Sequence, residues 1–168
     1  MKILFFLILI GVKILAFDPK FKTFSSDFLQ RVDSKSNSIE YKGNFILTQN
    51  QAFWNYTYPS NKQIYIQNNE IIIIEHDLEQ AIFAKLQTLP NLSKIFKQAT
   101  KIDTNLYEAK YQNITYKITL ENDEIKSISY QDELENIITI VLNNVKRDEI
   151  IDKQIFEAKI PPHYDTIY

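Results

Sequence analysis

The spacing of apolar residues predicts three helices. Apolar side chains recur every three or four positions over residues 17–32, which places them on one face of an amphipathic helix. A second helix is expected over residues 78–86, before Pro90 interrupts the pattern, and a short third helix follows. The apolar positions are Phe17, Phe21, Phe24, Phe28 and Val32 in the first helix, Leu78, Ala81, Ile82, Ala84 and Leu86 in the second, and Leu92, Ile95 and Phe96 in the third.

Over much of the remaining chain apolar and polar residues alternate, which is the period of a strand with one buried face. The clearest segments are 53–58, 63–67, 115–120, 125–130 and 138–142. Pairs that contain asparagine separate these segments, and asparagine tolerates the left-handed conformation that tight turns need. The pairs are Asn61-Lys62, Asn68-Asn69, Asn122-Asp123 and Asn143-Asn144.

The order of these elements predicts the fold class. A helix is followed by about four strands, two helices and then about five to seven strands, with no linker and no internal repeat. We therefore expect one antiparallel α+β domain, in which a strongly curved sheet carries helices against one face.

The first residues predict an export signal. Met1 and Lys2 precede an apolar run of about ten residues, and Ala16 precedes a more polar stretch. The run is shorter than the roughly 20 apolar residues that a membrane span needs. We expect a cleaved signal peptide over residues 1–16 and an exported domain over residues 17–168; an uncleaved anchor and a buried first helix are the alternatives.

Composition excludes several classes of function. The chain has 168 residues, is 45% apolar and contains two glycines, so it is neither disordered nor collagen-like. Without cysteine it has no disulfide, no thiolate metal site and no thiol nucleophile. The net charge of −2, with no basic block, argues against nucleic-acid binding.

Few residues point to catalysis. His76 and His163 lie in unrelated contexts, and neither has a second ligand at metal spacing. The segment Glu75-His76-Asp77 could form a metal or acid–base cluster, but a solvated turn is favoured, in which Asp77 caps the following helix with Gln80 completing a capping box. No glycine-rich phosphate loop is present. We expect no enzymatic activity, no metal and no cofactor.

The aromatic content is the unusual feature. Eleven Phe, ten Tyr and one Trp make up 13% of the chain. Most of them must fill the core, but a curved sheet of about ten strands encloses more interior than side chains readily fill. An apolar cavity for a hydrophobic ligand, roofed by the phenylalanine-rich first helix, is the functional interpretation.

Five segments, in order along residues 28–162, resemble the LolA-like family, the periplasmic carriers of outer-membrane lipoproteins. Phe28-Leu29-Gln30-Arg31-Val32 resembles the F-x-Q-basic-V of that family. The other four are Tyr41-Lys42-Gly43-Asn44-Phe45, Phe53-Trp54-Asn55-Tyr56-Thr57-Tyr58-Pro59, Asp77-Leu78-Glu79-Gln80-Ala81 and Phe156-Glu157-Ala158-Lys159-Ile160-Pro161-Pro162.

The resemblance implies a fold and a function. The fold is an unclosed antiparallel β-barrel of about ten to eleven strands, with short helices forming a lid over its concave apolar face. The function is to take acyl chains of lipoproteins from an ATP-driven releasing complex in the inner membrane to the outer membrane or its receptor, as a periplasmic monomer. The family commonly has an arginine that helps to hold the lid shut, but here that stretch is Thr48-Gln49-Asn50, so the lid must be held differently.

Strand alternation and the helical stripes then predict the ligand site. Trp54, Tyr56 and Tyr58 should face the concave side with Ile64 and Ile66, because Asn55 and Thr57 take the opposite face. The predicted lid and the rest of the cavity wall comprise Phe21, Phe24, Phe28, Val32, Phe45, Leu78, Ile82, Leu86 and Phe96.

Two other functions fit the same pattern. One is a sensory or regulatory periplasmic domain that binds a mislocalised lipoprotein or a partner protein. The other is a carrier of free lipid or glycolipid, because acyl chains linked to protein and acyl chains of free lipid would occupy the same cavity.

Overall fold

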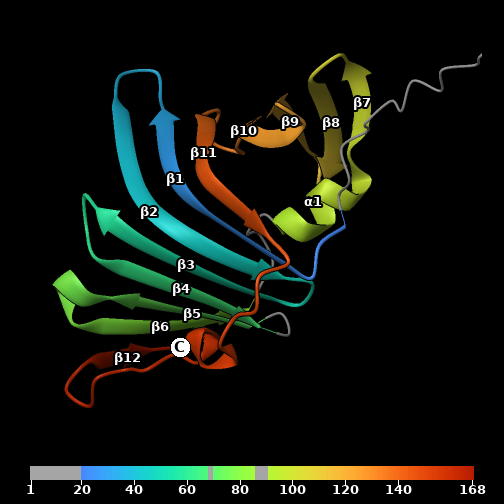
Figure 1. The fold of residues 1–168 in the computed structure, drawn as a ribbon. Helices are drawn as coiled ribbons and strands as arrows, with labels where there is room; N and C mark the ends of the chain where they lie inside the picture. The colour runs from blue at the N-terminus through green and yellow to red at the C-terminus, as the bar shows by residue number, and fades with distance from the viewer. Residues whose placement is uncertain (1–19, 68–69, 86–90) are drawn as a thin grey trace, which may run out of the picture.

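A computed structural model describes residues 20–67, 70–85 and 91–168, and within them all strands belong to one sheet of twelve (Figure 1). The predicted signal peptide, the Asn68-Asn69 turn and Leu86 lie outside the described residues. The strands are β1 (Thr23–Asp33), β2 (Ser38–Thr48), β3 (Gln51–Tyr58), β4 (Lys62–Gln67), β5 (Glu70–Glu75), β6 (Gln80–Lys85), β7 (Thr100–Asp103), β8 (Leu106–Tyr111), β9 (Ile114–Glu121), β10 (Glu124–Gln131), β11 (Ile137–Arg147) and β12 (Asp165–Ile167).

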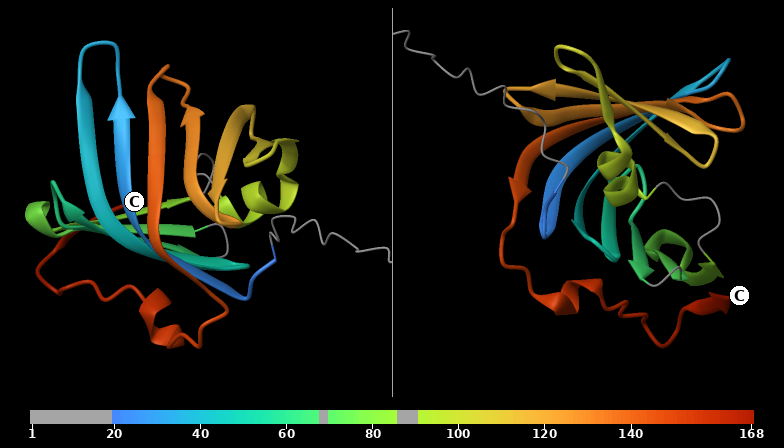
Figure 2. Two further views of the ribbon diagram at one scale, coloured as in Figure 1. Left: turned by 45° about the horizontal axis from the view of Figure 1, so that its top comes forward. Right: turned by 90° about the vertical axis from the view of Figure 1, so that its right-hand side faces the viewer.

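The sheet is strongly bent and does not close. Its order is β12-β6-β5-β4-β3-β2-β1-β11-β10-β9-β8-β7, and every neighbouring pair is antiparallel except β12 with β6. The long strands β1, β2 and β11 curve between two halves of the sheet that face each other (Figures 1 and 2). The predicted unclosed antiparallel barrel is confirmed, with twelve strands rather than the expected ten to eleven.

The first predicted helix is wrong, because residues 23–33 form β1 at the centre of the sheet. Phe24, Phe28 and Val32 are spaced by four residues, an even number, so a strand also places them on one face. Phe24 and Phe28 are buried accordingly. Pairing with both β2 and β11 decides between the two conformations, and β11 lies more than 100 residues away along the chain.

The second predicted helix is also wrong. Only a single 3-10 turn, His76–Leu78, forms there, and Glu79 follows it with a left-handed φ of 51° that leads into β6. The predicted cap is absent as well, since the Asp77 carboxylate instead accepts a hydrogen bond of 2.9 Å from the backbone N–H of Asn61. Gln80 donates to Glu75 rather than completing a capping box.

The third predicted helix is confirmed as α1 (Leu92–Gln98). Asn91 is its N-cap, and its side-chain oxygen accepts a hydrogen bond of 3.0 Å from the Lys94 N–H. Leu92, Ile95 and Phe96 are buried, as their spacing predicts. The helix lies on the concave side of the sheet, between its two halves (Figures 1 and 2). No helix in the described part of the chain is long and apolar enough to cross a membrane.

The alternating segments all form strands, and the turns mostly fall as expected. Asn122 and Asp123 both have positive φ, 52° and 64°, as a two-residue hairpin requires. The turn predicted at Asn143-Asn144 is wrong, because both residues lie within β11, where Asn144 has a φ of 53° at a break in the pairing with β1.

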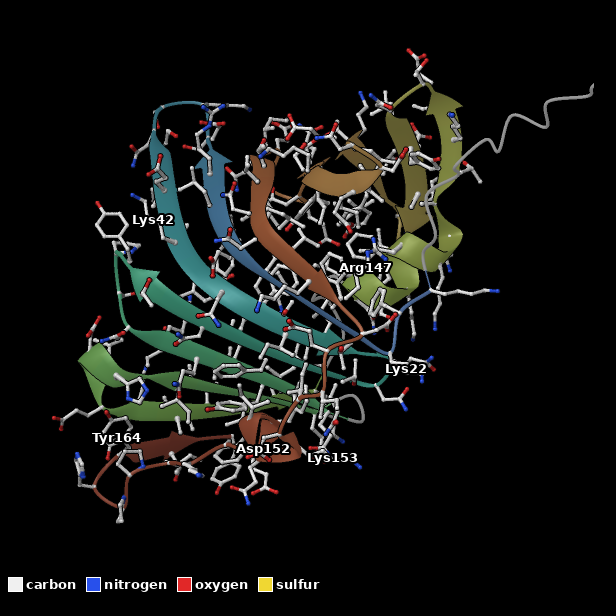
Figure 3. All side chains as sticks on the ribbon, in the orientation of Figure 1. Lys22, Lys42, Arg147, Asp152, Lys153 and Tyr164 are labelled. Atoms are coloured by element: carbon white, nitrogen blue, oxygen red, sulfur yellow. The ribbon has the colours of Figure 1, made fainter. Side chains whose placement is uncertain are left out.

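The sheet carries a separate apolar cluster on its convex face. Phe53, Tyr65 and Ile74 pack there against Phe156, which belongs to the 3-10 helix η2 (Lys153–Phe156). The chain then continues along the outside of the sheet to β12 (Figure 1). At this edge the Tyr164 hydroxyl lies 2.9 Å from Nδ1 of His76 (Figure 3).

Candidate ligand cavity

Strand alternation sends two sets of side chains to opposite faces of β3 and β4. Trp54 is directly opposite Ile64 in the register, and both face the concave side. Phe53 is opposite Tyr65, and both belong to the convex cluster. The polar side of β3 also follows the prediction, because the Asn55 amide donates to the Asn44 side chain at 3.1 Å.

The concave face encloses a cavity of about 140 Å³. Half of its lining comes from β3 and β4 and the other half from α1, β1, β10 and β11. The lining residues are Gln30, Trp54, Tyr56, Ile64, Ile66, Leu92, Tyr130 and Ile140. None of these side chains is charged, so the cavity suits a ligand that is largely apolar.

An aromatic layer supports the cavity from the sheet side. The ring of Phe28 lies edge-on to Trp54 and Tyr56, at centroid distances of 5.3 and 5.0 Å. Phe45 lies 4.5 Å from Trp54. Gly43 permits this packing, because a Cβ there would overlap the backbone oxygen of Asn55 and lie 3.0 Å from the tip of the Phe28 ring.

A packed phenylalanine cluster lies beside the cavity, beneath α1. Phe96 of α1 lies 5.7 Å from Phe24 and 6.4 Å from Phe21, and Phe24 stacks on Phe45 at 5.9 Å. Phe24, Phe45 and Phe96 are fully buried. This cluster anchors the helix to the sheet rather than lining the cavity.

The structure brings together only part of the predicted site. Trp54, Tyr56, Ile64 and Ile66 line the cavity. The residues packed beside it are Phe21, Phe24, Phe28, Phe45 and Phe96, with Val32 partly buried at the margin. The remaining predicted residues lie away from it.

Those remaining residues form no lid within the described part of the chain. Leu78 is 65% exposed in the β5–β6 turn, and Tyr58 is 53% exposed with the Lys42 ammonium 5.6 Å from its ring centroid. Ile82 is a half-buried strand residue opposite Ile73. The predicted lid of two striped helices is therefore wrong for residues 21–32 and 78–82, and α1 is the only described helix that covers the cavity.

Four lining residues were missed by the sequence prediction: Gln30, Leu92, Tyr130 and Ile140. Gln30 is two residues from Phe28, so a strand over this segment would have placed it on the concave face. Tyr130 and Ile140 lie in segments correctly predicted as strands, but alternation alone does not say which face is concave. Leu92 belongs to the correctly predicted short helix.

The cavity contains a small polar group of side chains. The Tyr56 hydroxyl donates a hydrogen bond of 3.2 Å to Oε1 of Gln30. Burial raises the pKa of Tyr130 to about 12, with smaller contributions from Tyr116 and Asp132, and burial also raises the pKa of Tyr56 well above its usual value. Both hydroxyls are therefore protonated and neutral at physiological pH.

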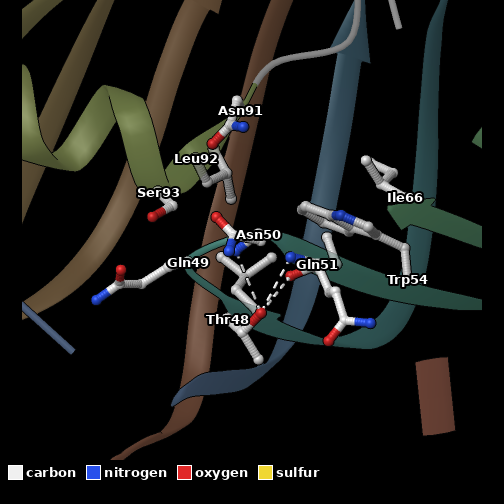
Figure 4. Close-up of a pocket in the computed structure, with 11 residues that line it drawn as sticks. Thr48, Gln49, Asn50, Gln51, Trp54, Ile66, Asn91, Leu92 and Ser93 are labelled. Carbon is white, nitrogen blue, oxygen red and sulfur yellow. Dashed lines mark hydrogen bonds between the residues drawn. The ribbon is translucent and has the colours of Figure 1, made fainter. Parts of the chain in front are cut away.

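Apolar contacts hold α1 over the cavity. A second, smaller cavity of about 30 Å³ lies between the start of α1 and the β2–β3 turn (Figure 4). In that turn the Thr48 hydroxyl accepts hydrogen bonds from the backbone of Asn50 and Gln51, at 3.3 and 3.0 Å. Among the described residues no hydrogen bond or ion pair connects this turn to α1, so the stretch without arginine does not latch the helix.

An ion pair on the concave side connects the end of β11 to the start of β10. Arg147 donates to both carboxylate oxygens of Glu124, at 2.8 and 2.7 Å, and its guanidinium lies 5.1 Å from the Phe24 ring centroid (Figure 3). Partial burial raises the pKa of Glu124, but the hydrogen bonds from Arg147 and from the Ile125 N–H, with the Arg147 charge, outweigh it. The net pKa is lowered.

The residues considered for catalysis lie apart from the cavity. His76 bonds to Tyr164 at the outer edge of the sheet, and Asp77 bonds to the backbone of Asn61. Within residues 20–67, 70–85 and 91–168, no three potential metal ligands come together. Around the cavity the arrangement is suited to binding rather than to acid–base chemistry.

Comparison with known proteins identifies relatives over nearly the whole chain. An outer-membrane lipoprotein carrier protein of Campylobacter jejuni is 49% identical over 98% of this chain and 96% of its own length. A protein of the same description from Wolinella succinogenes is 28% identical over 93% and 92%. No family model matches the chain.

Among solved structures, an uncharacterized conserved protein of Thermus thermophilus shares the fold. The TM-score is 0.54, and the match covers 89% of this chain and 91% of that chain. The sequence identity is 10%, so this likeness concerns the fold alone.

Proposed function

Because the chain belongs to the family of outer-membrane lipoprotein carrier proteins, we propose that it carries lipoproteins by burying their acyl chains in the concave cavity. The observation that supports this most directly is the uncharged cavity lined by Trp54, Ile64, Ile66 and Ile140 and covered by one short helix. The proposal assigns the concave face to the ligand and the convex face to stability.

An energetic requirement explains why such a protein needs a cavity. Exposing an acyl chain to water costs about 0.8 kcal/mol per methylene, so a long chain costs on the order of 10 kcal/mol. A carrier has to remove that surface from water and later give it up. A cavity whose cover is held by apolar contacts satisfies both needs, because the cover and the ligand compete for the same surface.

The size of the cavity implies that the structure is a closed form. Its volume of about 140 Å³ is close to that of an engineered protein cavity that accepts benzene. A long acyl chain needs several times this space, so loading requires α1 to move away from the sheet. Leu92 lines the cavity and lies at the first turn of α1, so movement of the helix would enlarge the cavity directly.

The partners and location follow from the family and remain part of the proposal. We infer that the mature chain acts in the periplasm as a monomer, after removal of residues 1–16. It would receive lipoproteins from an ATP-driven releasing complex of the inner membrane and deliver them to the outer membrane or to a receptor there. The carrier itself would need no catalytic group, metal or nucleotide.

A release assay tests the proposal. Purified protein is added to spheroplasts that lack their own carrier, and soluble lipoprotein in complex with it is measured. We expect Ile64→Glu, which places a carboxylate in the cavity, to lower release at least tenfold, since burying an unpaired charge is costly.

Ile72→Glu is the matched control. Ile72 is also a half-buried isoleucine, but it lies on the neighbouring strand and belongs to the convex cluster. The Ile72→Glu variant should yield as much soluble lipoprotein per folded molecule as the wild-type protein does. Equal loss in both variants, or no release by the wild-type protein, would contradict the proposed function.

A further inference from the structure

The polar residues of the cavity gather at one end of it. Strands β1, β3 and β10 run in the same direction, because each is separated from the next by one antiparallel strand. Gln30, Tyr56 and Tyr130 each lie within three residues of the C-terminal end of their strand. All three therefore lie toward the same end of these strands.

The opposite end of the cavity is apolar. Ile66 is opposite Ala52, near the start of β3, and Leu92 comes from the first turn of α1. Trp54 lies between the two ends, next to Ile64 in the register. The cavity therefore has one end that offers hydrogen bonds and another that offers only hydrocarbon contact.

At the polar end of the cavity, some hydrogen-bond donors bond to no acceptor among the described residues. The Tyr56 hydroxyl donates its hydrogen bond to Oε1 of Gln30. Among the described residues, no hydrogen bond is made by the Gln30 amide nitrogen or by the Tyr130 hydroxyl. An apolar ligand that displaced solvent from these donors without offering acceptors would leave them unsatisfied, at a substantial cost.

The donors suit a neutral acceptor. The hydroxyls stay protonated at physiological pH, because burial raises their pKa values. The side chains that line the cavity are uncharged, and the Lys62 ammonium, which lies 5.0 Å from the Tyr56 ring centroid, is not among them. Carbonyl oxygens are neutral acceptors that match amide and hydroxyl donors.

We propose that Gln30, Tyr56 and Tyr130 bind the ester and amide carbonyl oxygens that join acyl chains to the lipid-modified terminus of the cargo. This inference rests on the proposed function and adds the part of the ligand that the cavity recognises. The alkyl chains extend toward Trp54, Ile66 and Leu92. The attached peptide leaves the cavity past the C-terminal ends of β1, β3 and β10.

The inference predicts a preference between two lipids of equal chain length, against the order of their hydrophobicity, because the one without carbonyl groups is the more apolar. An ester-linked diacyl lipopeptide carries the carbonyl groups, and a dialkyl ether analogue of the same chain length lacks them. Binding is followed through Trp54, the single tryptophan of the chain, which lines the cavity. We expect the wild-type protein to bind the ester about tenfold more tightly, the effect of one to two net hydrogen bonds.

Tyr130→Phe is the variant that tests the assignment. It removes only the hydroxyl, and we expect it to weaken ester binding about three- to tenfold while ether binding stays unchanged. Tyr65→Phe is the control, because it removes a tyrosine hydroxyl on the convex face that bonds to Gln63. Its preference for the ester should equal that of the wild type.

The outcomes separate the inference from the proposed function. Equal binding of ester and ether by the wild-type protein overturns the carbonyl site and leaves the carrier function intact. No binding of either lipopeptide overturns both. A diacyl phospholipid that binds as tightly as the lipopeptide, with the same loss in Tyr130→Phe, supports the carbonyl site but contradicts the proposed cargo in favour of free lipid.

Discussion

The two faces of β3 carry adjacent residues with different surroundings. Phe53 on the convex face is sealed by Phe156, which is 5% exposed, whereas Trp54 on the concave face borders a cavity. Apolar side chains lie on both faces, but the two apolar clusters are covered by different parts of the chain. The outer cover is the end of the chain itself, and the inner cover is one helix of seven residues.

The two covers are also attached differently. The outer segment pairs with β6 through β12, and the Asp165 N–H donates to the Glu79 carbonyl at 2.9 Å. Tyr164 and His76 add a side-chain contact. Helix α1 has no such polar tie to the β2–β3 turn among the described residues. We therefore propose that the face whose cover lacks such polar contacts is the one available to a ligand.

The largest effect is expected beneath α1. Phe24→Ala should lower the free energy of unfolding by about 4 kcal/mol, because the ring is fully buried among Phe21, Phe45 and Phe96 and its removal leaves a cavity. Urea unfolding measures this directly. A loss below about 1 kcal/mol would show that this cluster is not part of the fixed core.

A somewhat smaller effect is expected on the convex face. Phe156→Ala should cost about 3 kcal/mol in unfolding free energy, because it uncovers Phe53 and Tyr65. The affinity of the folded protein for a lipopeptide should not change. If that affinity falls together with the stability, the convex face is not merely structural and the comparison fails.

A conservative pair of substitutions sharpens the comparison of the two covers. Ile95→Val in α1 and Ile74→Val on the convex face each remove one methyl group from a side chain with no exposed surface, so each should cost about 1 kcal/mol. Only Ile95→Val weakens the closed position of α1, and it should raise lipopeptide affinity by up to about fivefold. Equal affinities in the two variants would contradict competition between the helix and the ligand.

The smallest effect is expected from the ion pair on the concave side. The pKa of Glu124 is lowered in the folded state, so its contribution is present above its ordinary value of 4.5 and is lost as the pH falls through the folded pKa. Because the pair is partly exposed, the contribution is at most about 1 kcal/mol. Wild-type protein should therefore lose more stability than Glu124→Gln between about pH 5 and pH 3; parallel pH profiles would argue against this ion pair.

The sequence predicts the parts of the molecule where local pattern and packing agree. Alternation in residues 53–58 and 63–67 identifies two strands and the side of each that carries Trp54 and Ile64. The spacing of Leu92, Ile95 and Phe96 identifies α1, since no strand offers them a shared face. Ordered landmarks along the chain identify the family.

The errors arise where the spacing of apolar residues fits both a helix and a strand. They also arise where pairing with residues distant in the sequence determines the conformation. Phe24, Phe28 and Val32 satisfy both a helix and a strand, and the pairing of β1 with β11 is not visible locally. Gln30 falls between the apolar positions of the predicted helix, so the sequence does not predict its place in the cavity. The left-handed Glu79 turns the chain into β6, although residues 78–86 have the composition of a helix.

The most direct test of the central claim compares the two faces in contact with cargo. A photoreactive amino acid is placed at Ile64, which lines the cavity, or at Ile72, which lies in the convex cluster, and each protein is irradiated with lipoproteins released from spheroplasts. The account predicts cross-links from position 64 to the acylated terminus and none from position 72. Cross-links from position 72 alone, or equally from both, would contradict the assignment of the concave face to the ligand.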